Sequence, residues 1–337
     1  MGLGFPGKLL NCGAGRDGKC SSAMNEPIYF EPIAMDRVWG GRRFESVLGK
    51  AIPHGVPIGE LWEVVDREDA QSIVHEGPLR GTSLHQLWAD ERAEVFGDDY
   101  LPDPSFRFPL LVKLLDARER LSVQVHPPLH LAESLGGDPK TEVWYFMDAL
   151  PGARIYAGLK RGVTREEFES ALANGDVEGT LHEIPVTSGE SLFIASGRLH
   201  AIGEGNLIVE VQQNSDTTYR VFDWNRLGLD GQPRALHIPE SLASIDFEDF
   251  EPPVCSSAES LVASCPFFHV KKVNLSAPAD VRLSGRFALV AVTAGRVQCG
   301  SATFERGRFF IVPAKGSGLD VAPIGGAAEV LITTLPV

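Results

Sequence analysis

Short apolar runs separated by turn residues recur along this chain and restrict the folds that are open to it. Runs rich in β-branched and aromatic residues include FPLLVKLL, LSVQVHP, EVWYFM, SLFIASG, NLIVEVQQ, ALVAVTAG and RFFIVPA. Turn signals such as SGE, GEG and RGR separate them. Runs of this length bounded by Gly and Pro are typical of strands. The pattern therefore predicts an all-β protein, either a barrel or a sandwich.

Two segments depart from this pattern and predict small helices inserted between strands. Residues 164–174 begin with a capping box, in which Thr164 and Glu167 satisfy each other's backbone N–H groups. Gly175 follows as a stop signal. Residues 83–96 carry leucine and tryptophan at helical spacing and are the second predicted helix.

Composition excludes several classes of function. The formal net charge of −14 argues against nucleic acid as a partner, because nucleic-acid binders cluster Lys and Arg against phosphates. No stretch has the apolar length of a membrane-spanning helix, so no membrane partner is expected. The five cysteines are scattered and odd in number, which favours a reducing, cytoplasmic location over a disulfide framework. The sequence does not indicate an oligomeric state.

A polar face in the segment SVQVHP is the first candidate for chemistry. Successive side chains of a strand point to opposite sides, so Ser122, Gln124 and His126 share one face, and Val123 and Val125 share the other. A buried polar face needs partners that satisfy it. The alternative is the solvated outer face of an amphipathic strand.

Two further segments favour the buried alternative and a metal site. Lys140 and Glu142 share a face of an otherwise apolar strand, where a lone carboxylate is costly unless it is paired or metal-bound. His200 follows a turn and enters the next strand. Together Gln124, His126, Glu142 and His200 supply nitrogen and oxygen ligands suited to Zn²⁺, and also to Fe²⁺, Mn²⁺ or Co²⁺. The lack of thiolate ligands favours a catalytic site over a structural zinc.

A weak internal repeat predicts how the chain is divided. Residues 189–197 resemble residues 307–315, and His200 in the first copy falls opposite Gly318 in the second. Two related barrels, of which the first alone kept a metal site, would explain this match. The predicted organisation is a flexible leader (1–25), a catalytic metal-binding barrel with helical insertions (26–245), a linker (246–253) and a second, metal-free barrel (254–337).

The segment that ends in FDWNR adds charged groups suited to an anionic ligand. Asp216 and Arg220 share a face if the chain stays extended, and Arg220 offers a planar fork of donors for an oxyanion or a phosphate. An ordinary Asp–Arg surface pair is the alternative.

These motifs together resemble type I mannose-6-phosphate isomerases, and most closely the short bacterial members that lack a large helical insertion. The resemblance is carried by LLVKLLDARERLSVQVHP, PKTEVWYF and GESLFIASGRLHAIGEGNLIVEVQQNSDTTYRVFDWNR, and it extends from about residue 26 to about residue 250. It implies two cupin-type (jelly-roll) β-barrels, one zinc ion per chain and a small phosphosugar as substrate.

The resemblance also implies roles for individual residues. The family's zinc ligands fall on the four residues chosen above, namely Gln124, His126, Glu142 and His200. Its catalytic or pocket residues fall on Arg220, Asp216, Lys140 and Glu210, and its substrate-contacting residues on Ser122 and Arg226. Longer members carry a lysine where this chain has Arg226, so the phosphate role of Arg226 rests on a departure from the family pattern.

The implied reaction is the interconversion of mannose 6-phosphate and fructose 6-phosphate through an enediolate. Glu210 is the favoured proton carrier and Asp216 the alternative, while Lys140 has a role in ring opening or in proton transfer. Two other functions stay open: another metal-dependent enzyme on the same fold, such as a dioxygenase, and a sugar-phosphate-binding regulator without turnover.

Overall fold

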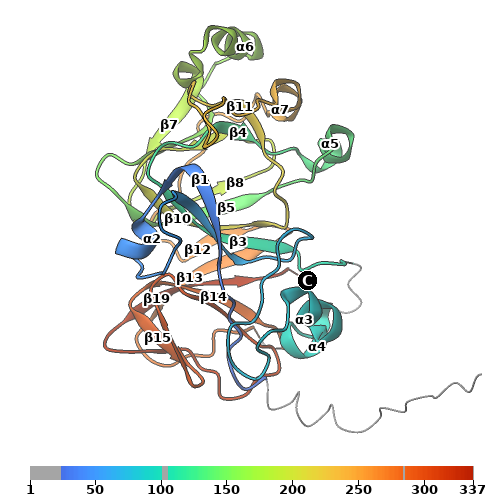
Figure 1. Cartoon of the computed structure of the whole chain (residues 1–337), viewed down its shortest axis with the longest axis vertical. Helices are drawn as coiled ribbons and strands as arrows, with labels where there is room; N and C mark the ends of the chain where they lie inside the picture. The colour runs from blue at the N-terminus through green and yellow to red at the C-terminus, as the bar shows by residue number, and fades with distance from the viewer. Residues whose placement is uncertain (1–23, 101–104, 284, 337) are drawn as a thin grey trace, which may run out of the picture.

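Four antiparallel β-sheets stacked in layers form the framework of the described residues, which are 24–100, 105–283 and 285–336 of this computed structural model (Figure 1). A six-stranded sheet has the order β1-β2-β3-β10-β5-β8, and a five-stranded sheet with the order β11-β4-β9-β6-β7 lies above it in Figure 1. The strands of the first sheet are β1 (Ile33–Gly41), β2 (Ile58–Val64), β3 (Leu110–Ala117), β10 (Asn206–Gln213), β5 (Glu142–Ala149) and β8 (Ser191–Ile194). The strands of the second are β11 (Tyr219–Phe222), β4 (Val123–Val125), β9 (His200–Ile202), β6 (Arg154–Leu159) and β7 (Leu181–Pro185).

The C-terminal part of the chain forms the other two layers. A five-stranded sheet has the order β12-β13-β19-β14-β17, and a three-stranded sheet the order β16-β15-β18. Their strands are β12 (Leu261–Ser264), β13 (His269–Leu275), β19 (Ala328–Thr334), β14 (Ala288–Ala294), β17 (Phe309–Val312), β16 (Ala302–Glu305), β15 (Arg296–Cys299) and β18 (Ala322–Pro323).

The six-stranded sheet and the C-terminal five-stranded sheet, here called the two large sheets, have matching strand orders. Position by position along the sheets, five strands of the first match the five strands of the second: β2 matches β12, β3 matches β13, β10 matches β19, β5 matches β14 and β8 matches β17. The repeated sequence segments contain β8 and β17, which are edge strands at equivalent positions. Glu142 pairs with Ile194 in the first sheet, and Ala288 pairs with Val312 in the second. The counterpart of Glu142 is therefore an alanine, which has no ligand atom.

Apolar side chains pack between these layers. One core lies between the two large sheets and joins residues of both, among them Val143, Val209, Val270 and Leu331. A second core, which includes Trp144 and Ile208, separates the six-stranded sheet from the five-stranded sheet above it. Because the first core is shared, burial of its apolar surface stabilises the N-terminal and C-terminal parts together.

The helices are short and lie at the margins of the sheets. They are α2 (Arg43–Ser46), α3 (Leu84–Asp90), α4 (Arg92–Val95), α5 (Leu129–Ala132), α6 (Arg165–Asn174) and α7 (Ile238–Ser244), with 3₁₀ turns at Asp98–Tyr100, Glu133–Leu135 and Val177–Thr180. Helix α6 has the predicted capping box and ends at Gly175 in the left-handed conformation, as expected. None of the helices among the described residues is long and apolar enough to cross a membrane.

The prediction of one continuous helix over residues 83–96 was wrong in one respect. The structure breaks it into α3 and α4 at Glu91, whose φ of −122° and ψ of 24° lie outside the helical region. The apolar periodicity continues through the break because Trp88 and Val95 both face the core. Periodicity alone therefore could not locate the interruption.

The mainly β architecture confirms the predicted all-β class. The predicted flexible leader falls largely on residues 1–23, which lie outside the described residues. Of its last two positions, Met24 is buried, whereas Asn25 is exposed and its Oδ1 accepts hydrogen bonds from the backbone N–H and the hydroxyl of Ser317. In the predicted linker, Asp249 accepts two hydrogen bonds from Arg198.

Candidate metal centre and adjoining cavity

Strand alternation separates apolar and polar side chains on the two faces of the six-stranded sheet. On β5, Val143 and Tyr145 enter the core between the two large sheets. Trp144 points the other way, toward the five-stranded sheet that contains β4 and β9. Glu142 lies on the same side as Trp144 because it is two residues away. On β10 the same rule puts Glu210 on this inner side, two residues from Ile208. Two carboxylates therefore enter the space between the two sheets.

The facing sheet contributes the histidines and the amide. Val123 and Val125 pack in an outer apolar cluster beneath α6 and α7, so Gln124 points inward, as the alternation predicted. Gln124 is the cross-strand partner of both Arg220 and His200. Pairing of β4 with β9 and β11 thus brings together residues that are far apart in sequence.

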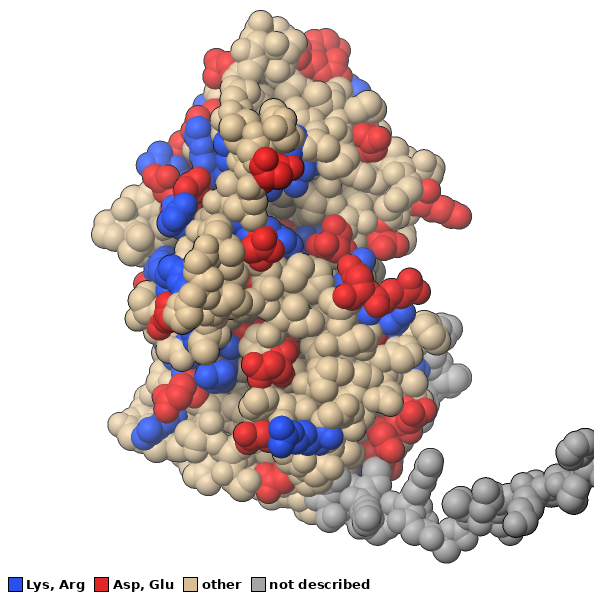
Figure 2. Space-filling view, viewed as in Figure 1, with Lys and Arg blue, Asp and Glu red and all other residues tan. Residues whose placement is uncertain are grey.

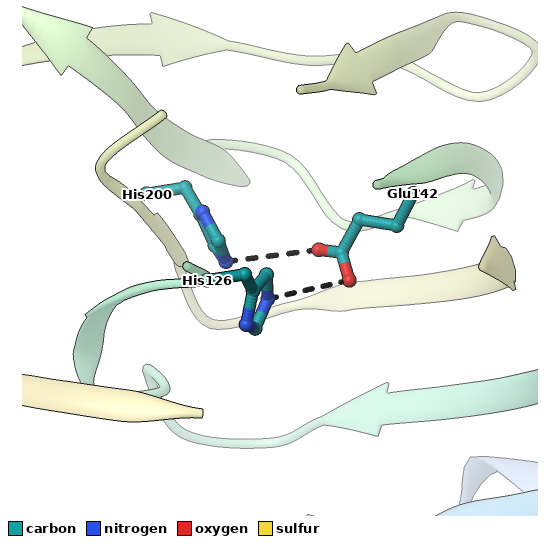
Figure 3. A group of neighbouring side chains, drawn as sticks. All are labelled: His126, Glu142 and His200. Atoms are coloured by element: carbon teal, nitrogen blue, oxygen red, sulfur yellow. Dashed lines mark ion pairs between the residues drawn. The ribbon is translucent and has the colours of Figure 1, made fainter. Parts of the chain in front are cut away.

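His126, Glu142 and His200 converge at one buried point between the sheets (Figure 3). His126 Nε2 lies 3.4 Å from Glu142 Oε2, and His200 Nε2 lies 3.6 Å from Glu142 Oε1. One ligand atom of each residue lies within 4.8 Å of the ligand atoms of the other two. The Gln124 amide nitrogen is 3.3 Å from His200 Nε2. Because the two ends of an amide are assigned from their surroundings, a half-turn of the group would present its oxygen instead.

The ring nitrogens that face away from this point fix the tautomer of both imidazoles. His126 Nδ1 donates to Thr217 O at 2.9 Å, and His200 Nδ1 donates to Arg198 O at 2.8 Å. Each Nε2 therefore carries a lone pair directed toward Glu142. Among the described residues, His126 Nε2 and Glu142 Oε1 are buried without a hydrogen-bond partner, whereas Glu142 Oε2 has Lys140 Nζ as an ionic partner at 3.0 Å. Unsatisfied buried acceptors that converge in this way are what a divalent cation would satisfy.

The electrostatic environment keeps these groups in the forms that bind a metal. Burial lowers the pKa of His200 to about 3, and His126 beside it acts in the same direction. Burial also lowers the pKa of His126, with a further contribution from Lys140. Burial alone would raise the pKa of Glu142, but Lys140 and His126 outweigh it and hold that pKa well below 4.5. Both rings are thus neutral and the carboxylate is ionised at neutral pH.

A cavity of about 400 Å³ adjoins this point. Figure 2 shows basic and acidic side chains interspersed over the visible face, with a hollow in its upper half. The cavity is lined by polar and charged side chains from both sheets, and by a few apolar ones: Arg37, Trp39, Glu60, Lys113, Leu115, Leu121, Ser122, Gln124, Lys140, Ile202, Glu210, Asp216, Thr218, Arg220 and Arg234. This volume is sufficient for a small polar molecule.

Glu210 is held rigidly in the cavity wall. Its Oε1 accepts a hydrogen bond of 3.0 Å from Trp144 Nε1, and its Oε2 lies 3.2 Å from Lys113 Nζ. Burial, followed by the negative charge of Glu142, raises the pKa of Glu210. Such a carboxylate can exchange a proton closer to neutral pH than an exposed one.

Lys140, Ser122, Asp216 and Arg220 also reach the cavity. Lys140 Nζ lies 3.0 Å from Glu142 Oε2, and Ser122 Oγ donates to Gln124 Oε1 at 3.3 Å. Arg220 Nη1 donates to Ala235 O, while its buried Nε has no partner among the described residues. Arg220 makes no ion pair with Asp216 within the described part of the chain, so the surface-pair alternative is not what the structure contains.

Arg226 is the predicted site residue that the structure does not bring to the cavity wall. Its Nε and Nη2 contact Asp223 Oδ1 at 3.0 and 2.9 Å. The same carboxylate also binds Arg234, through Nε at 2.7 Å and Nη2 at 2.5 Å. Arg234, which was not singled out in the sequence, lines the cavity instead. The loop sequence alone did not indicate which of the two arginines lines the cavity.

Three other charged residues of the cavity were missed. Arg37 holds both oxygens of Glu60 at 3.1 and 3.0 Å, and Trp62 Nε1 donates to the same carboxylate at 2.8 Å. Lys113 lies on the next strand and is buried beside Glu210. A sequence signal for two of them exists, since Glu60 and Lys113 are charged residues within largely apolar strands, IGELWEV and LLVKLLDA.

Comparison with known proteins identifies relatives of this chain. The family profile described as phosphomannose isomerase type I, catalytic domain, matches residues 29–145. The mannose-6-phosphate isomerase of Streptococcus mutans is 38% identical over 280 residues, which is 81% of this chain and 86% of that protein. Mannose-6-phosphate isomerase ManA of Bacillus subtilis is 33% identical over 329 residues, covering 92% and 99%. A solved mannose 6-phosphate isomerase from Bacillus subtilis superposes with a TM-score of 0.79 at 30% identity, covering 92% of this chain and all of the other.

Proposed function

Because this chain belongs to the type I phosphomannose isomerase family, we propose that it is a metal-dependent aldose–ketose isomerase that interconverts mannose 6-phosphate and fructose 6-phosphate. The observation that carries the proposal is the convergence of buried ligand atoms of His126, Glu142 and His200 within 4.8 Å of one another, next to a charged cavity. Neither the regulator nor the dioxygenase alternative has support from the relatives.

His126, Glu142, His200 and the Gln124 oxygen are the proposed ligands of a single zinc ion. Two imidazoles, a carboxylate and an amide oxygen suit Zn²⁺, and the same donors accept other divalent cations. When bound, the ion would stabilise negative charge on the sugar oxygens as a Lewis acid. Lys140 lies 3.0 Å from Glu142 and balances its charge, which keeps the carboxylate ionised.

Glu210 is the proposed carrier of the proton between C1 and C2. Isomerisation removes a weakly acidic hydrogen from C2 of the open sugar and returns one to C1, so one base that reaches both carbons is sufficient. Trp144 and Lys113 fix the carboxylate of Glu210 within the cavity. Asp216 is exposed and no described side chain fixes its carboxylate, which makes it the weaker alternative. Lys140 is positioned to help open the sugar ring.

Arginines at the cavity wall are the proposed sites for negative charge: Arg234 for the phosphate, and Arg220 as the catalytic cation that would stabilise charge developing on the sugar oxygens. Arg220, Arg234 and Arg37 all line the cavity. Burial, and next the charge of Arg234, lowers the pKa of Arg220, which reflects crowding of positive charge without a full set of anionic partners. A phosphate would relieve that repulsion and accept hydrogen bonds from more than one guanidinium. Arg226 acts in this proposal by sharing Asp223 with Arg234, and Ser122 contacts a sugar hydroxyl.

The division of the chain into two barrels and a linker is part of the same proposal. Each pair of sheets corresponds to one cupin-type barrel, with the catalytic barrel in residues 26–245, a linker in 246–253 and a metal-free barrel in 254–337. The metal-free barrel shares a core with the first and covers one face of its large sheet. A cytoplasmic location and a free phosphosugar as the partner complete the assignment.

A coupled assay tests this function. The full-length protein, freed of metal with a chelator and reloaded with Zn²⁺, should convert mannose 6-phosphate to fructose 6-phosphate. The chelated protein should be inactive. Reloaded, folded protein that binds the sugar phosphate without converting it would favour the regulator, and metal-dependent oxygen consumption would favour the dioxygenase.

A further inference from the structure

A second cavity lies between the N-terminal segment and the C-terminal sheets, and it shares no lining residue with the proposed active site. Its volume is about 640 Å³. The walls come from residues 26–32, from 75–78, and from β16 and the start of β17. Glu63 of β2 reaches this cavity, whereas Glu60 of the same strand reaches the active-site cavity. The two cavities therefore open on different sides of β2.

The floor of this cavity holds a buried ion pair for which the isomerase reaction has no use. Lys50 Nζ donates to Glu63 Oε1 at 2.7 Å, and each side chain is only 3% exposed. An ammonium group has three donors, and Glu63 is the acceptor found for Lys50 among the described residues. Burying such a pair costs desolvation energy that its attraction barely repays, so stability alone does not account for it. Polar groups at a cavity floor are suited to contacting a ligand.

The walls combine aromatic surface with hydrogen-bonding groups. Tyr29 packs edge-on against Phe304 with ring centroids 5.3 Å apart. The Tyr29 hydroxyl donates to Glu76 at 2.7 Å, and His75 Nδ1 lies 2.8 Å from Glu31. These carboxylates keep further lone pairs for donors on a ligand.

The charged side chains that line this cavity favour a neutral ligand over an anionic one. Five carboxylates line the cavity, against two cations, Lys50 and Arg308; the carboxylates are Glu26, Glu31, Glu63, Glu76 and Glu305. This excess of negative charge disfavours a phosphorylated sugar. Hydroxyl groups, in contrast, can donate to the carboxylates and accept from the cations, while the C–H surface of a sugar packs on aromatic rings.

We propose that the cavity floored by Lys50 and Glu63 is a second binding site, which takes a neutral, polyhydroxylated molecule such as a sugar or a sugar alcohol. Its ligand differs from the substrate in having no phosphate. The site is independent of the proposed isomerase function because it uses none of the residues of the active-site cavity.

Binding of two probes, D-mannitol and methyl α-D-mannopyranoside, tests this site in the full-length, zinc-loaded protein. Calorimetry and saturation-transfer NMR would be run with the equilibrium mixture of mannose 6-phosphate and fructose 6-phosphate present, so that the active-site cavity is occupied. At least one probe should bind. Failure of both to bind, or loss of binding when the sugar phosphates are added, would overturn the proposal.

A double variant locates the site. Lys50→Met combined with Glu63→Gln removes both charges together, which is tolerated better than removal of one partner. It should weaken probe binding at least about tenfold and leave kcat and KM of the isomerase unchanged. Glu76→Gln, at the exposed rim, should weaken binding to a smaller extent and serves if the double variant does not fold. Glu183→Gln, whose partner is Arg154 on an exposed surface, is the matched control. Equal affinity in the wild type, the double variant and Glu76→Gln would also overturn the proposal.

Discussion

Gln124 on β4 and His200 on β9 are direct cross-strand partners, and their side-chain nitrogens lie 3.3 Å apart. They are separated by 76 residues in sequence. The pairing fixes two of the proposed ligands on one sheet, whereas Glu142 approaches from the sheet that faces it. The candidate metal centre therefore depends on how these two sheets pack, and its consequences can be tested residue by residue.

Arg220 is predicted to act in turnover and not in metal binding. Arg220→Ala should lower kcat more than about tenfold, equivalent to about 1.4 kcal/mol in the barrier, because a preorganised cation is lost from the cavity wall. Metal content, measured by atomic emission, should not change. Near-normal kcat would show that Arg220 is not catalytic.

Substitutions of Glu210 and of Asp216 are predicted to lower kcat to very different extents. Glu210→Gln should lower kcat by about 100-fold or more, since a fixed general base is lost. Asp216→Asn should have a much smaller effect, because Asp216 is exposed at the cavity margin. Exchange of the C2 hydrogen with deuterated solvent provides a direct readout. Exchange that survives in Glu210→Gln but is lost in Asp216→Asn would reverse the assignment.

Asp223 is predicted to position the phosphate-binding arginine. Asp223→Asn should raise KM for mannose 6-phosphate about tenfold with a smaller change in kcat, because Arg234 loses its ionic partner and one of its two acceptor oxygens. Arg234→Ala should have the same effect, and Arg226→Ala a weaker one, because Arg226 does not line the cavity. A larger KM effect for Arg226→Ala than for Arg234→Ala would return the phosphate contact to Arg226.

Glu60 is predicted to make stability depend on pH in the acid range. Burial disfavours its charge, but Lys113 and Arg37 outweigh burial and lower the pKa of Glu60 from 4.5 to about 2. A depressed pKa contributes stability that is fully present above pH 4.5 and is lost as the pH falls toward 2. The difference in unfolding free energy between wild type and Glu60→Gln, from urea titrations, should therefore shrink across this window. A difference that stays constant from pH 6 to pH 2 would contradict the assignment.

Strand alternation made much of the candidate site predictable. The period of two places Ser122, Gln124 and His126 on one face without any knowledge of the partner strands. In the structure, Ser122 and Gln124 line the cavity and His126 lies at the adjoining metal-capable cluster. Glu142 was identifiable because an isolated carboxylate in an apolar strand needs a partner. Convergence of these residues could be expected from the family resemblance but not from spacing, since it depends on sheet packing.

Loops and single charges were harder to interpret. Arg226 and Arg234 lie on one loop, and a shared contact with Asp223 decides which of them reaches the cavity. No sequence period describes such a contact. Likewise, the break between α3 and α4 at Glu91 interrupts the backbone while the apolar stripe continues. Lys113 and Glu60 were missed because their partners, Glu210 and Arg37, lie on neighbouring strands that are distant in sequence.

The central claim is that Glu142 binds a metal ion together with His126 and His200. Metal stoichiometry of the purified Glu142→Gln variant, measured beside wild type and beside Glu183→Gln as a matched surface control, tests it most directly. Wild type and control should each retain one zinc per chain after dialysis, and Glu142→Gln should lose most of its metal while keeping its circular dichroism spectrum. Undiminished zinc in Glu142→Gln would contradict the account.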